Sequence, residues 1–323
     1  MSKMPRDFFR KATPGLMSPS GNIITDVQTA LVKAGCNGLT VDGRFGAQTQ
    51  TALQTFQTAR GLPLTGTVSD TTWTALMATP EPPIFTRCLQ VTGAFEGTGF
   101  GGVVGNFDGA GITWGIIGFT LMNGELGVVL ARINAGYPGL IANAFGADAD
   151  TLMQMAGGAS TPAQKAAWAD SISLGAQKYQ VAEPWKTNFR TLGSEPAVQQ
   201  IEIGRARDLY WATALRDSGD LAMSDELDFL LFFDTAVQNG GLGSKGRLQT
   251  IKDAFNTQQP NTELARRRIV AQVIADTSNP KYKQDVLSRK LSISVGRGAI
   301  HGDTYDFGDW GLLDGQKPTN PDA

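Results

Sequence analysis

The sequence predicts a mainly α-helical protein, in which a three-helix module precedes a larger helical domain with a small sheet. Apolar residues recur at helical spacing along most of the 323-residue chain. One segment, residues 97–111, instead contains seven glycines around a Val-Val pair, which predicts a β-hairpin. Three prolines within residues 79–83 remove amide donors and indicate an extended linker between the two domains.

The composition is that of an ordinary globular protein. Hydrophobic residues make up 41% of the chain and charged residues 18%, and the formal net charge is −2. This balance argues against a nucleic-acid partner, since such partners require clustered basic charge. Residues 1–17 contain no continuous apolar core, and no apolar run is long enough to span a membrane. We therefore expect no secretory signal peptide, no stable membrane insertion and a monomer.

Shifts in composition place the domain boundaries. Residues 1–20 form a basic N-terminal tail, with four basic residues and one acidic residue among the first eleven, and we expect this tail to be solvated. The helical module occupies residues 21–78 and the linker residues 79–83. The larger domain occupies residues 84–312, and residues 313–323 form a C-terminal tail.

Three short helices are predicted in the module. The first begins with a capping box at Thr25 and ends before Gly35. The second carries an apolar stripe and ends at Gly61, because a glycine readily adopts the left-handed conformation that ends a helix. The third begins near Ser69 and directs Trp73 inward.

Two turn motifs echo one another within the module. Residues 39–53 recur in shorter form as residues 64–76, and in both copies a capping Asp or Ser opens a helix. The segments Val-Asp-Gly-Arg-Phe-Gly at 41–46 and Gly-Leu-Pro-x-Thr-Gly-x-Val at 61–68 resemble those of the three-helix peptidoglycan-binding domains found on cell-wall hydrolases. The resemblance implies peptidoglycan as the partner, bound between the helix ends.

Helical periodicity also dominates beyond the linker. Residues 84–95 form a short apolar helix that leads into Glu96. Further helices are predicted over residues 123–133, 162–178, 196–215, 224–239, 262–276 and 282–291.

The segment from Asp108 to Phe119 reads Asp-Gly-Ala-Gly-Ile-Thr-Trp-Gly-Ile-Ile-Gly-Phe and places one carboxylate and the hydroxyl of Thr113 among glycines. Glu96 supplies a second carboxylate just upstream. Cleavage of a glycosidic bond uses such a pair: one acid protonates the leaving oxygen, and the other activates water or attacks the anomeric carbon. Taken alone, the pattern fits turn chemistry with surface charge as well.

This segment is similar to the catalytic segment of the family 46 chitosanases, which are inverting glycoside hydrolases with a lysozyme-like fold. The resemblance implies that Glu96 is the general acid, Asp108 the general base and Thr113 the residue that holds the attacking water. The two acids lie closer in sequence than in the family, and Gly97 replaces the usual Asn. The larger domain is accordingly expected to be a lysozyme-like α+β domain with many helices and a small sheet.

Asp234 lies on or beside the apolar face of its predicted helix, where a carboxylate requires a cation or several donors. The candidate partners are Arg205, Arg207 and Arg289. In chitosanases an Asp in the similar segment joins an arginine network behind the catalytic Glu. The resemblance therefore implies that Asp234, Arg205 and Arg289 orient and tune Glu96. A purely structural salt bridge is the alternative.

Two further residues are candidates for substrate binding. Glu125 corresponds in position to an Asp with which chitosanases grip the free amine of their substrate. Its alternative role is that of an acid in the first turn of a helix, which the helix dipole favours, and we prefer this role because peptidoglycan has few free sugar amines. Gln238 lies on the same helix face as Asp234.

The chain contains a single histidine, His301, in a glycine-flanked segment that predicts a turn. Zinc hydrolases that attack cell walls usually need several imidazole ligands, so we predict no metal site. A pair of carboxylates needs no histidine, and no organic cofactor is implied.

These features predict a peptidoglycan hydrolase that cuts the glycan strand, as an N-acetylmuramidase that inverts configuration. The domain order and the expected lack of a signal peptide resemble phage endolysins, made in the host cytoplasm and released to act on the wall in the periplasm. The alternatives are a chitosanase with a wall-binding module, a lytic transglycosylase, a wall-degrading effector injected into neighbouring bacteria, and a catalytically inactive wall-binding protein.

Overall fold

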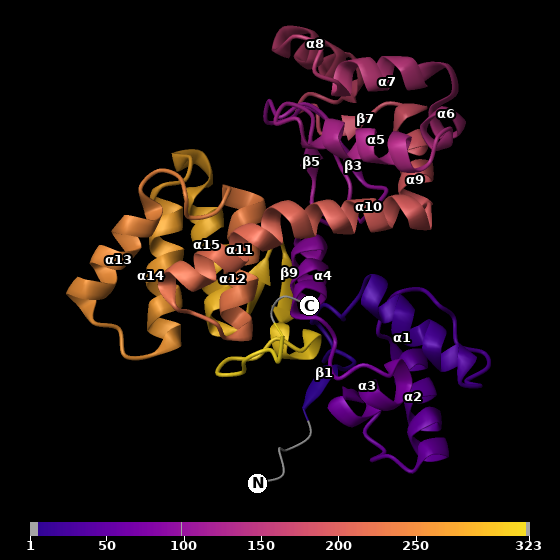
Figure 1. Ribbon diagram of the computed structural model, residues 1–323, viewed down its shortest axis with the longest axis vertical. Helices are drawn as coiled ribbons and strands as arrows, with labels where there is room; N and C mark the ends of the chain where they lie inside the picture. Colours follow the sequence, from indigo (N-terminus) through magenta and orange to yellow (C-terminus); the bar gives the residue numbers. More distant parts are fainter. Residues whose placement is uncertain (1–5, 98, 321–323) are drawn as a thin grey trace. The chain divides into compact units, whose positions relative to one another are not determined.

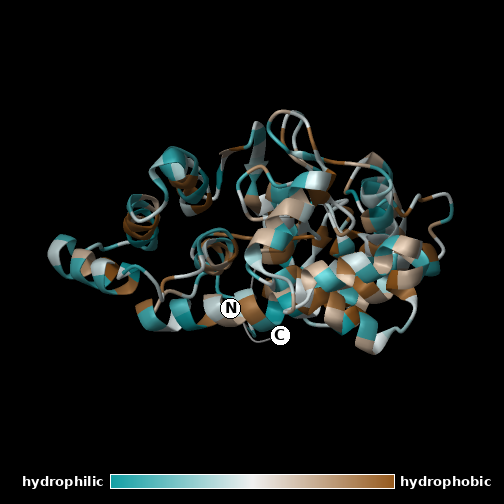
Figure 2. Ribbon diagram, turned by 90° about the horizontal axis from the view of Figure 1, so that it is seen from above, coloured by the Kyte–Doolittle hydropathy of each residue, from teal (hydrophilic) through white to brown (hydrophobic). Residues whose placement is uncertain are grey.

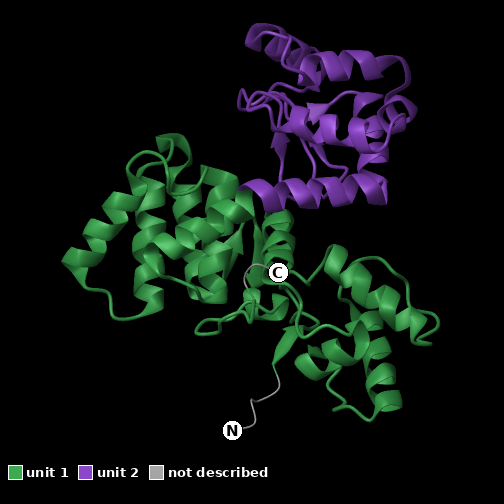
Figure 3. Ribbon diagram, viewed as in Figure 1, with its two compact units in different colours: residues 1–95, 210–323 green, residues 96–209 purple. Residues whose placement is uncertain are grey.

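The computed structural model describes residues 6–97 and 99–320, most of which lie in helices (Figure 1). The chain divides into two compact units, one formed by residues 1–95 and 210–323 and the other by residues 96–209 (Figure 3). The prediction of a mainly helical fold with small sheets is confirmed.

The first unit contains the module and most of the later helices. The module consists of α1 (Asn22–Lys33), α2 (Ala47–Arg60) and α3 (Asp70–Met77). The other helices that contribute to this unit are α4 (Ile84–Glu96), α11 (Ala212–Leu221), α12 (Glu226–Asn239), α13 (Arg247–Gln258), α14 (Glu263–Asp276) and α15 (Lys283–Val295). Its antiparallel strand pairs are β1 (Asp7–Phe9) with β2 (Val68–Ser69), and β8 (Arg297–Ile300) with β9 (Asp303–Asp306).

The second unit combines short helices with two small sheets. Its helices are α5 (Glu125–Gly136), α6 (Leu140–Phe145), α7 (Ala149–Ala156), α8 (Pro162–Ile172), α9 (Trp185–Ser194) and α10 (Pro196–Ala206). Its strands are β3 (Val103–Val104), β4 (Thr113–Trp114) and β5 (Phe119–Thr120), which form one sheet, and β6 (Ser173–Leu174) and β7 (Gln180–Val181), which form another.

Apolar and polar residues alternate along many of the helices, as expected for helices with one face on a core (Figure 2). Helix α12 is buried on all sides over most of its length, because every residue from Glu226 to Ala236 is buried. A carboxylate in this stretch is therefore surrounded by protein, and it must find its partners there.

Several predicted helix ends are correct. The hydroxyl of Ser69 accepts a hydrogen bond from the amide of Thr72 at the start of α3, and Gly61 ends α2 at φ 63°. The start predicted at Thr25 is wrong, because α1 begins at Asn22. Ile23 and Ile24 are both buried in the module core, and their packing extends the helix toward its N-terminus.

Other predicted helices are shorter than their periodicity suggested. The helix predicted over residues 196–215 is divided, since a π-helical turn at Arg207–Trp211 separates α10 from α11. The helix predicted over residues 162–178 ends at Ile172, where the chain enters the β6–β7 pair. The helix predicted over residues 224–239 begins at Glu226, and Asp225 caps it in a capping box with Asp228.

The glycine-rich segment contributes one strand of a three-stranded sheet. The predicted hairpin within residues 97–111 is wrong, because β3 pairs with β4, which lies outside that segment, and β4 pairs in turn with β5. Gly109 and Gly111 adopt φ values of 85° and 77°, so this stretch forms a loop rather than a second strand.

The expectation of a solvated N-terminal tail is wrong for residues 6–12. Phe8 and Phe9 are each only 1% exposed, and strand β1 pairs with β2 of the module. Basic charge suggested a solvated segment, but the two adjacent aromatic side chains gain more from burial than the chain loses by being ordered. The segment is part of the core of the first unit.

A buried acid holds this N-terminal segment to later parts of the first unit. Glu226 Oε1 accepts hydrogen bonds from Arg6 and, at 2.7 Å, from Nη1 of Arg87. Its other oxygen accepts from the amide of Leu313 at 3.1 Å, and Arg6 also donates to the carbonyl of Gly311 at 2.9 Å. The carboxylate therefore joins four segments that are distant in sequence.

Candidate active site

Glu96 is the last residue of α4, an almost entirely buried helix in which Cys88, Leu89 and Val91 are fully enclosed. Glu96 itself is half-buried. The helix thus ends where its sequence changes from apolar residues to the glycine-rich segment. This places the carboxyl group at the edge of a packed core, as the sequence predicted for residues 84–95.

The β8–β9 hairpin fixes the end of α4. The ring of Phe95 makes edge contacts with Tyr305 and Phe307, with centroids 5.1 and 6.0 Å apart. His301, in the turn between the two strands, places Nδ1 3.1 Å from the carbonyl oxygen of Phe95. The predicted turn histidine therefore contacts the residue that precedes Glu96.

Asp108 and Thr113 lie on the loop and first strand that follow β3. Asp108 is exposed, and its Oδ1 accepts a hydrogen bond from the amide of Ala110 at 3.0 Å. Thr113 is half-buried on β4, opposite Thr120 of β5. The exposed carboxylate and the hydroxyl therefore lie on one short segment, a loop that leads into β4.

Asn106 braces this loop. Its Oδ1 accepts from the amide of Gly111 at 2.9 Å, and its Nδ2 donates to Asp170 at 2.6 Å. The backbone amide of Asn106 donates to the hydroxyl of Ser173 at 2.9 Å. The loop that carries Asp108 is consequently tied to the end of α8. No local sequence pattern indicates this role for Asn106.

Glu202 supports the other end of the same segment. It is fully buried on α10, and its Oε2 accepts a hydrogen bond from the amide of Ile116 at 2.9 Å. Gly115 adopts φ 92°, and a side chain there would meet Oε2 at 2.7 Å, so only glycine fits. Burial raises the pKa of Glu202 well above its ordinary value, which favours the neutral acid.

The raised pKa of Glu202 predicts a pH-dependent stability. The folded chain holds this proton at pH values where the unfolded chain releases it, so the free energy of unfolding falls as pH rises from about 4 toward the raised pKa, by up to about 1.4 kcal/mol per pH unit. Glu202→Gln should remove this decline. Urea unfolding of both proteins at several pH values tests it, and parallel curves would contradict the prediction.

Asp234 forms the centre of a buried ionic cluster. Arg289 donates to its two oxygens from Nε at 3.1 Å and from Nη2 at 2.5 Å, and Nζ of Lys290 donates to its Oδ2. Lys290 also donates to Oε1 of Gln238 at 2.9 Å. Of the predicted partners, Arg289 makes this ion pair; Lys290 was not predicted.

Two cations surround the single carboxylate of Asp234, and one of them lies close to the end of α4. Burial disfavours ionisation of Asp234, but the charges of Arg289 and Lys290 outweigh it and hold the pKa of Asp234 below its ordinary value. The guanidinium of Arg289 also lies 4.8 Å from the ring centroid of Phe95. The cation that neutralises Asp234 thereby packs on the residue before Glu96.

Arg205 pairs with Glu125 in the second unit. Its Nε and Nη2 donate to the two carboxylate oxygens of Glu125 at 2.7 and 2.9 Å, and both side chains are largely buried. Glu125 is the first residue of α5, where the helix dipole favours an acid. The carboxylate of Glu125 therefore forms a bidentate ion pair with Arg205.

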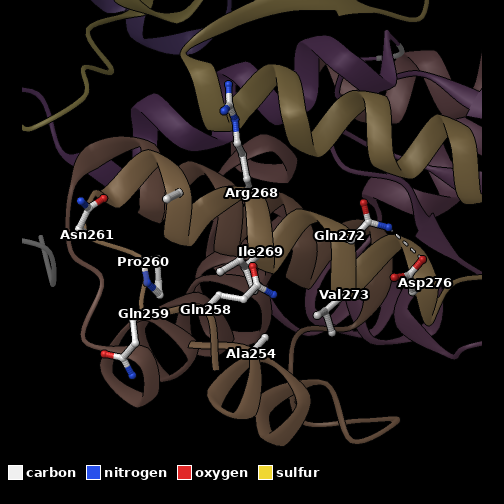
Figure 4. Close-up of a pocket in the computed structure, with 11 residues that line it drawn as sticks. Ala254, Gln258, Gln259, Pro260, Asn261, Arg268, Ile269, Gln272, Val273 and Asp276 are labelled. Atoms are coloured by element: carbon white, nitrogen blue, oxygen red, sulfur yellow. Dashed lines mark hydrogen bonds between the residues drawn. The ribbon is translucent and has the colours of Figure 1, made fainter. Parts of the chain in front are cut away.

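Gln238 lines a pocket of about 340 Å³ in the first unit, formed by the end of α12 and the chain between α14 and α15. A second pocket of about 510 Å³ lies in the module, between residues 35–39 and the first turns of α2. A third, of about 780 Å³, is lined by α13 and α14, with several amide side chains around Ile269 and Val273 (Figure 4). It includes no residue predicted for the site.

Within the described residues, no three His, Cys, Asp or Glu side chains gather in a group that could hold a metal ion. No helix in the same part of the chain is both long enough and apolar enough to cross a membrane.

Comparisons with known proteins extend these observations. Residues 20–76 match the family model of a peptidoglycan binding domain, in agreement with the predicted module. No curated protein matches the chain.

The solved structures give a match for the fold. The chain is similar to a family 46 chitosanase from Gynuella sunshinyii, whose structure holds chitotetraose, with a TM-score of 0.50 and 17% sequence identity. The alignment covers 70% of this chain and 98% of the chitosanase. The predicted lysozyme-like, chitosanase-like fold is therefore confirmed at the level of architecture.

Proposed function

We propose that this chain is a glycoside hydrolase of the bacterial cell wall, an N-acetylmuramidase that hydrolyses the bond between N-acetylmuramic acid and N-acetylglucosamine. The observation that carries the proposal is the presence, in one chain, of a match to a peptidoglycan binding domain and of the fold of a family 46 chitosanase. The first feature supports wall glycan as the partner, and the second supports cleavage of a β-linked polysaccharide.

Glu96 is the proposed general acid. A general acid must deliver its proton to the glycosidic oxygen as the bond to the anomeric carbon breaks. Its position at the end of a buried helix, held through Phe95 by His301 and Arg289, supports a fixed orientation of the carboxyl group. In this scheme Asp234 is a positioning residue, because it fixes Arg289.

Asp108 is the proposed general base. It removes a proton from the water that attacks the anomeric carbon on the opposite face of the sugar, and the hydroxyl of Thr113 holds that water. Asp108 is exposed, which suits a group that must meet solvent water. Inversion of configuration follows, and the two carboxyl groups are expected to lie about 6.5–9.5 Å apart in the complex with substrate.

The pairing of Glu125 favours a muramidase over a chitosanase. Chitosan carries a positive amine on most sugars, and a site for it benefits from carboxylates that are available to that amine. Glu125, the residue that corresponds in position to the amine-gripping Asp, instead binds Arg205 through both oxygens. Peptidoglycan sugars carry neutral acetamido groups, which do not require a free carboxylate as a partner.

The module pocket between residues 35–39 and α2 is the proposed wall-binding surface. Thr51→Trp would fill this pocket, because Thr51 is an exposed residue of its lining. We expect the affinity for purified sacculi to fall roughly tenfold or more, as for the loss of one well-made contact. Co-sedimentation measures this affinity. The matched control is Thr58→Trp, on an exposed position of the same helix outside the pocket; an equal loss in both variants would contradict the assignment.

A comparison of substrates tests the proposed function. The protein should release soluble fragments from purified Gram-negative peptidoglycan and much less reducing sugar from soluble chitosan. The opposite preference would identify a chitosanase with a wall-binding module, the second candidate that the fold supports. No release from either polymer would indicate a catalytically inactive wall-binding protein.

Two aspects of the biology belong to the same proposal. We propose that the protein acts on the wall in the periplasm after release from the cytoplasm, as an endolysin does. An effector injected into neighbouring bacteria would share the chemistry, but it would require an immunity protein in the producing cell. The presence or absence of such a partner next to this gene distinguishes the two.

A further inference from the structure

We propose that the 340 Å³ pocket beside Gln238 is a binding site for an N-acetylated sugar, with the ring of Tyr282 as its stacking surface and the side-chain carbonyl of Asn239 as the acceptor for the acetamido N–H. Only the identity of the polymer that carries this sugar, peptidoglycan, rests on the proposed function.

The lining has the chemistry of a carbohydrate site. The pocket is built from amides, a hydroxyl, an aromatic ring and a few charges around a buried Val286, and its lining residues include Gln238, Asn239, Ser278, Asn279 and Tyr282. Its volume lies in the range of small-molecule pockets, about 300–1,000 Å³. Sugars present hydroxyl groups for the amides and C–H faces for a ring.

Tyr282 offers a partly exposed aromatic ring at the pocket. Its side chain is 39% exposed, and the residue directly precedes α15. The ammonium of Lys281 lies 5.0 Å from the ring centroid. An exposed aromatic ring that lines a pocket can stack against an apolar sugar face on the side that Lys281 does not cover.

Asn239 supplies an unused acceptor. Its Oδ1 is buried and has no hydrogen-bond partner among the described residues, and its Nδ2 makes only a long bond of 3.4 Å to Ser278. Buried polar atoms are nearly always paired, so in this proposal a donor of the ligand completes the unpaired Oδ1 of this pocket-lining residue. The N–H of an acetamido group is such a donor.

The charges of the pocket select against a free amine. Lys245 and Arg247 line it with two positive charges, and Asp285 with one negative charge, so the lining is net positive. An ammonium on the sugar would meet this positive balance, whereas a neutral acetamido group would not. The pocket therefore favours N-acetylated over deacetylated sugars.

The pocket is also connected to the residues around Glu96. Gln238 contacts Lys290, which binds Asp234, and the carboxylate of Asp285 lies 3.5 Å from Nε2 of His301. His301 in turn contacts the carbonyl of Phe95. Two short contact chains within the first unit therefore link the pocket to the end of α4.

Titration of the full chain carrying Glu96→Gln with N,N′,N″-triacetylchitotriose, followed by NMR or calorimetry, tests the proposal. Binding should weaken about tenfold in Tyr282→Ala and in Asn239→Leu, each combined with Glu96→Gln. Tyr137→Ala is the matched control, since Tyr137 is 45% exposed and lines none of the three pockets described above. Fully deacetylated chitotriose should bind about tenfold more weakly than the acetylated trisaccharide.

The outcomes separate this proposal from the proposed function. Three results would overturn the pocket assignment even if peptidoglycan is cleaved. The trisaccharide does not bind; or the Tyr282 and Asn239 variants bind it as tightly as the parent Glu96→Gln protein; or chitotriose binds more tightly than the acetylated trisaccharide. Trisaccharide binding that depends on Tyr282 and Asn239, in a protein that does not cleave peptidoglycan, would support the pocket and reject the proposed function.

Discussion

Glu96→Gln is expected to reduce the rate of peptidoglycan solubilisation by about 10²- to 10⁴-fold, the range that a general acid contributes. Glutamine keeps the size and hydrogen-bonding shape of the side chain but has no proton to give to the leaving oxygen. Glu96 is half-buried at the last position of α4, so a side chain of nearly the same shape should leave the fold unchanged. Release of dyed fragments from labelled sacculi measures the rate.

The companion variant Asp108→Asn should show a loss in the same range, because an amide cannot accept the proton of the attacking water. Asp150→Asn is the matched control, since Asp150 is an exposed acid of α7 that lies outside the site. All three variants should retain binding to sacculi and the thermal midpoint of the native chain. A Glu96→Gln protein that solubilises sacculi at the native rate would remove Glu96 from the mechanism.

The second large effect is expected at Asp234. Asp234→Ala should lower the free energy of unfolding by about 3–5 kcal/mol, since it leaves the charges of Arg289 and Lys290 buried without their partner. Chemical unfolding at pH 7 measures this loss. The control is Asp276→Ala, which breaks a half-exposed pair with Lys283 and should cost about 0–1 kcal/mol. Equal losses in the two variants would contradict the conclusion that Asp234 neutralises buried cations.

The same cluster predicts how stability responds to acid. The pKa of Asp234 is lower in the folded chain than its ordinary value of about 3.9, so the ionised group stabilises the fold at pH values above that value. This contribution is lost as pH falls through the lower, folded pKa. Unfolding curves of native protein and Asp234→Ala should therefore converge only in strong acid, and convergence near neutral pH would contradict the assignment.

Local sequence patterns predicted the parts of the fold that depend on neighbouring residues. The start of α3 at Ser69 and the end of α2 at Gly61 each depend on one residue with a known helix-end preference. The segment from Asp108 to Phe119 could be recognised because its glycines and its two candidate catalytic side chains occur within twelve consecutive residues.

Contacts between distant segments could not be predicted in the same way. Lys290 is 56 positions from Asp234, and Arg6 is 220 positions from Glu226, so no local pattern links either pair. The aromatic pair Phe8 and Phe9 was overlooked because the surrounding basic charge suggested a solvated tail. Nothing in the segment around Glu202 indicates that its carboxyl group is buried against the amide of Ile116.

The most direct test of the proposed function is mass spectrometry of the fragments that the native chain and Glu96→Gln release from purified Gram-negative peptidoglycan. The proposal predicts disaccharide-peptides with a reducing N-acetylmuramic acid end from the native chain, and a loss of these products in the variant. Anhydro-muramic ends would identify a lytic transglycosylase instead. Reducing N-acetylglucosamine ends, or equal product from both proteins, would contradict a muramidase that depends on Glu96.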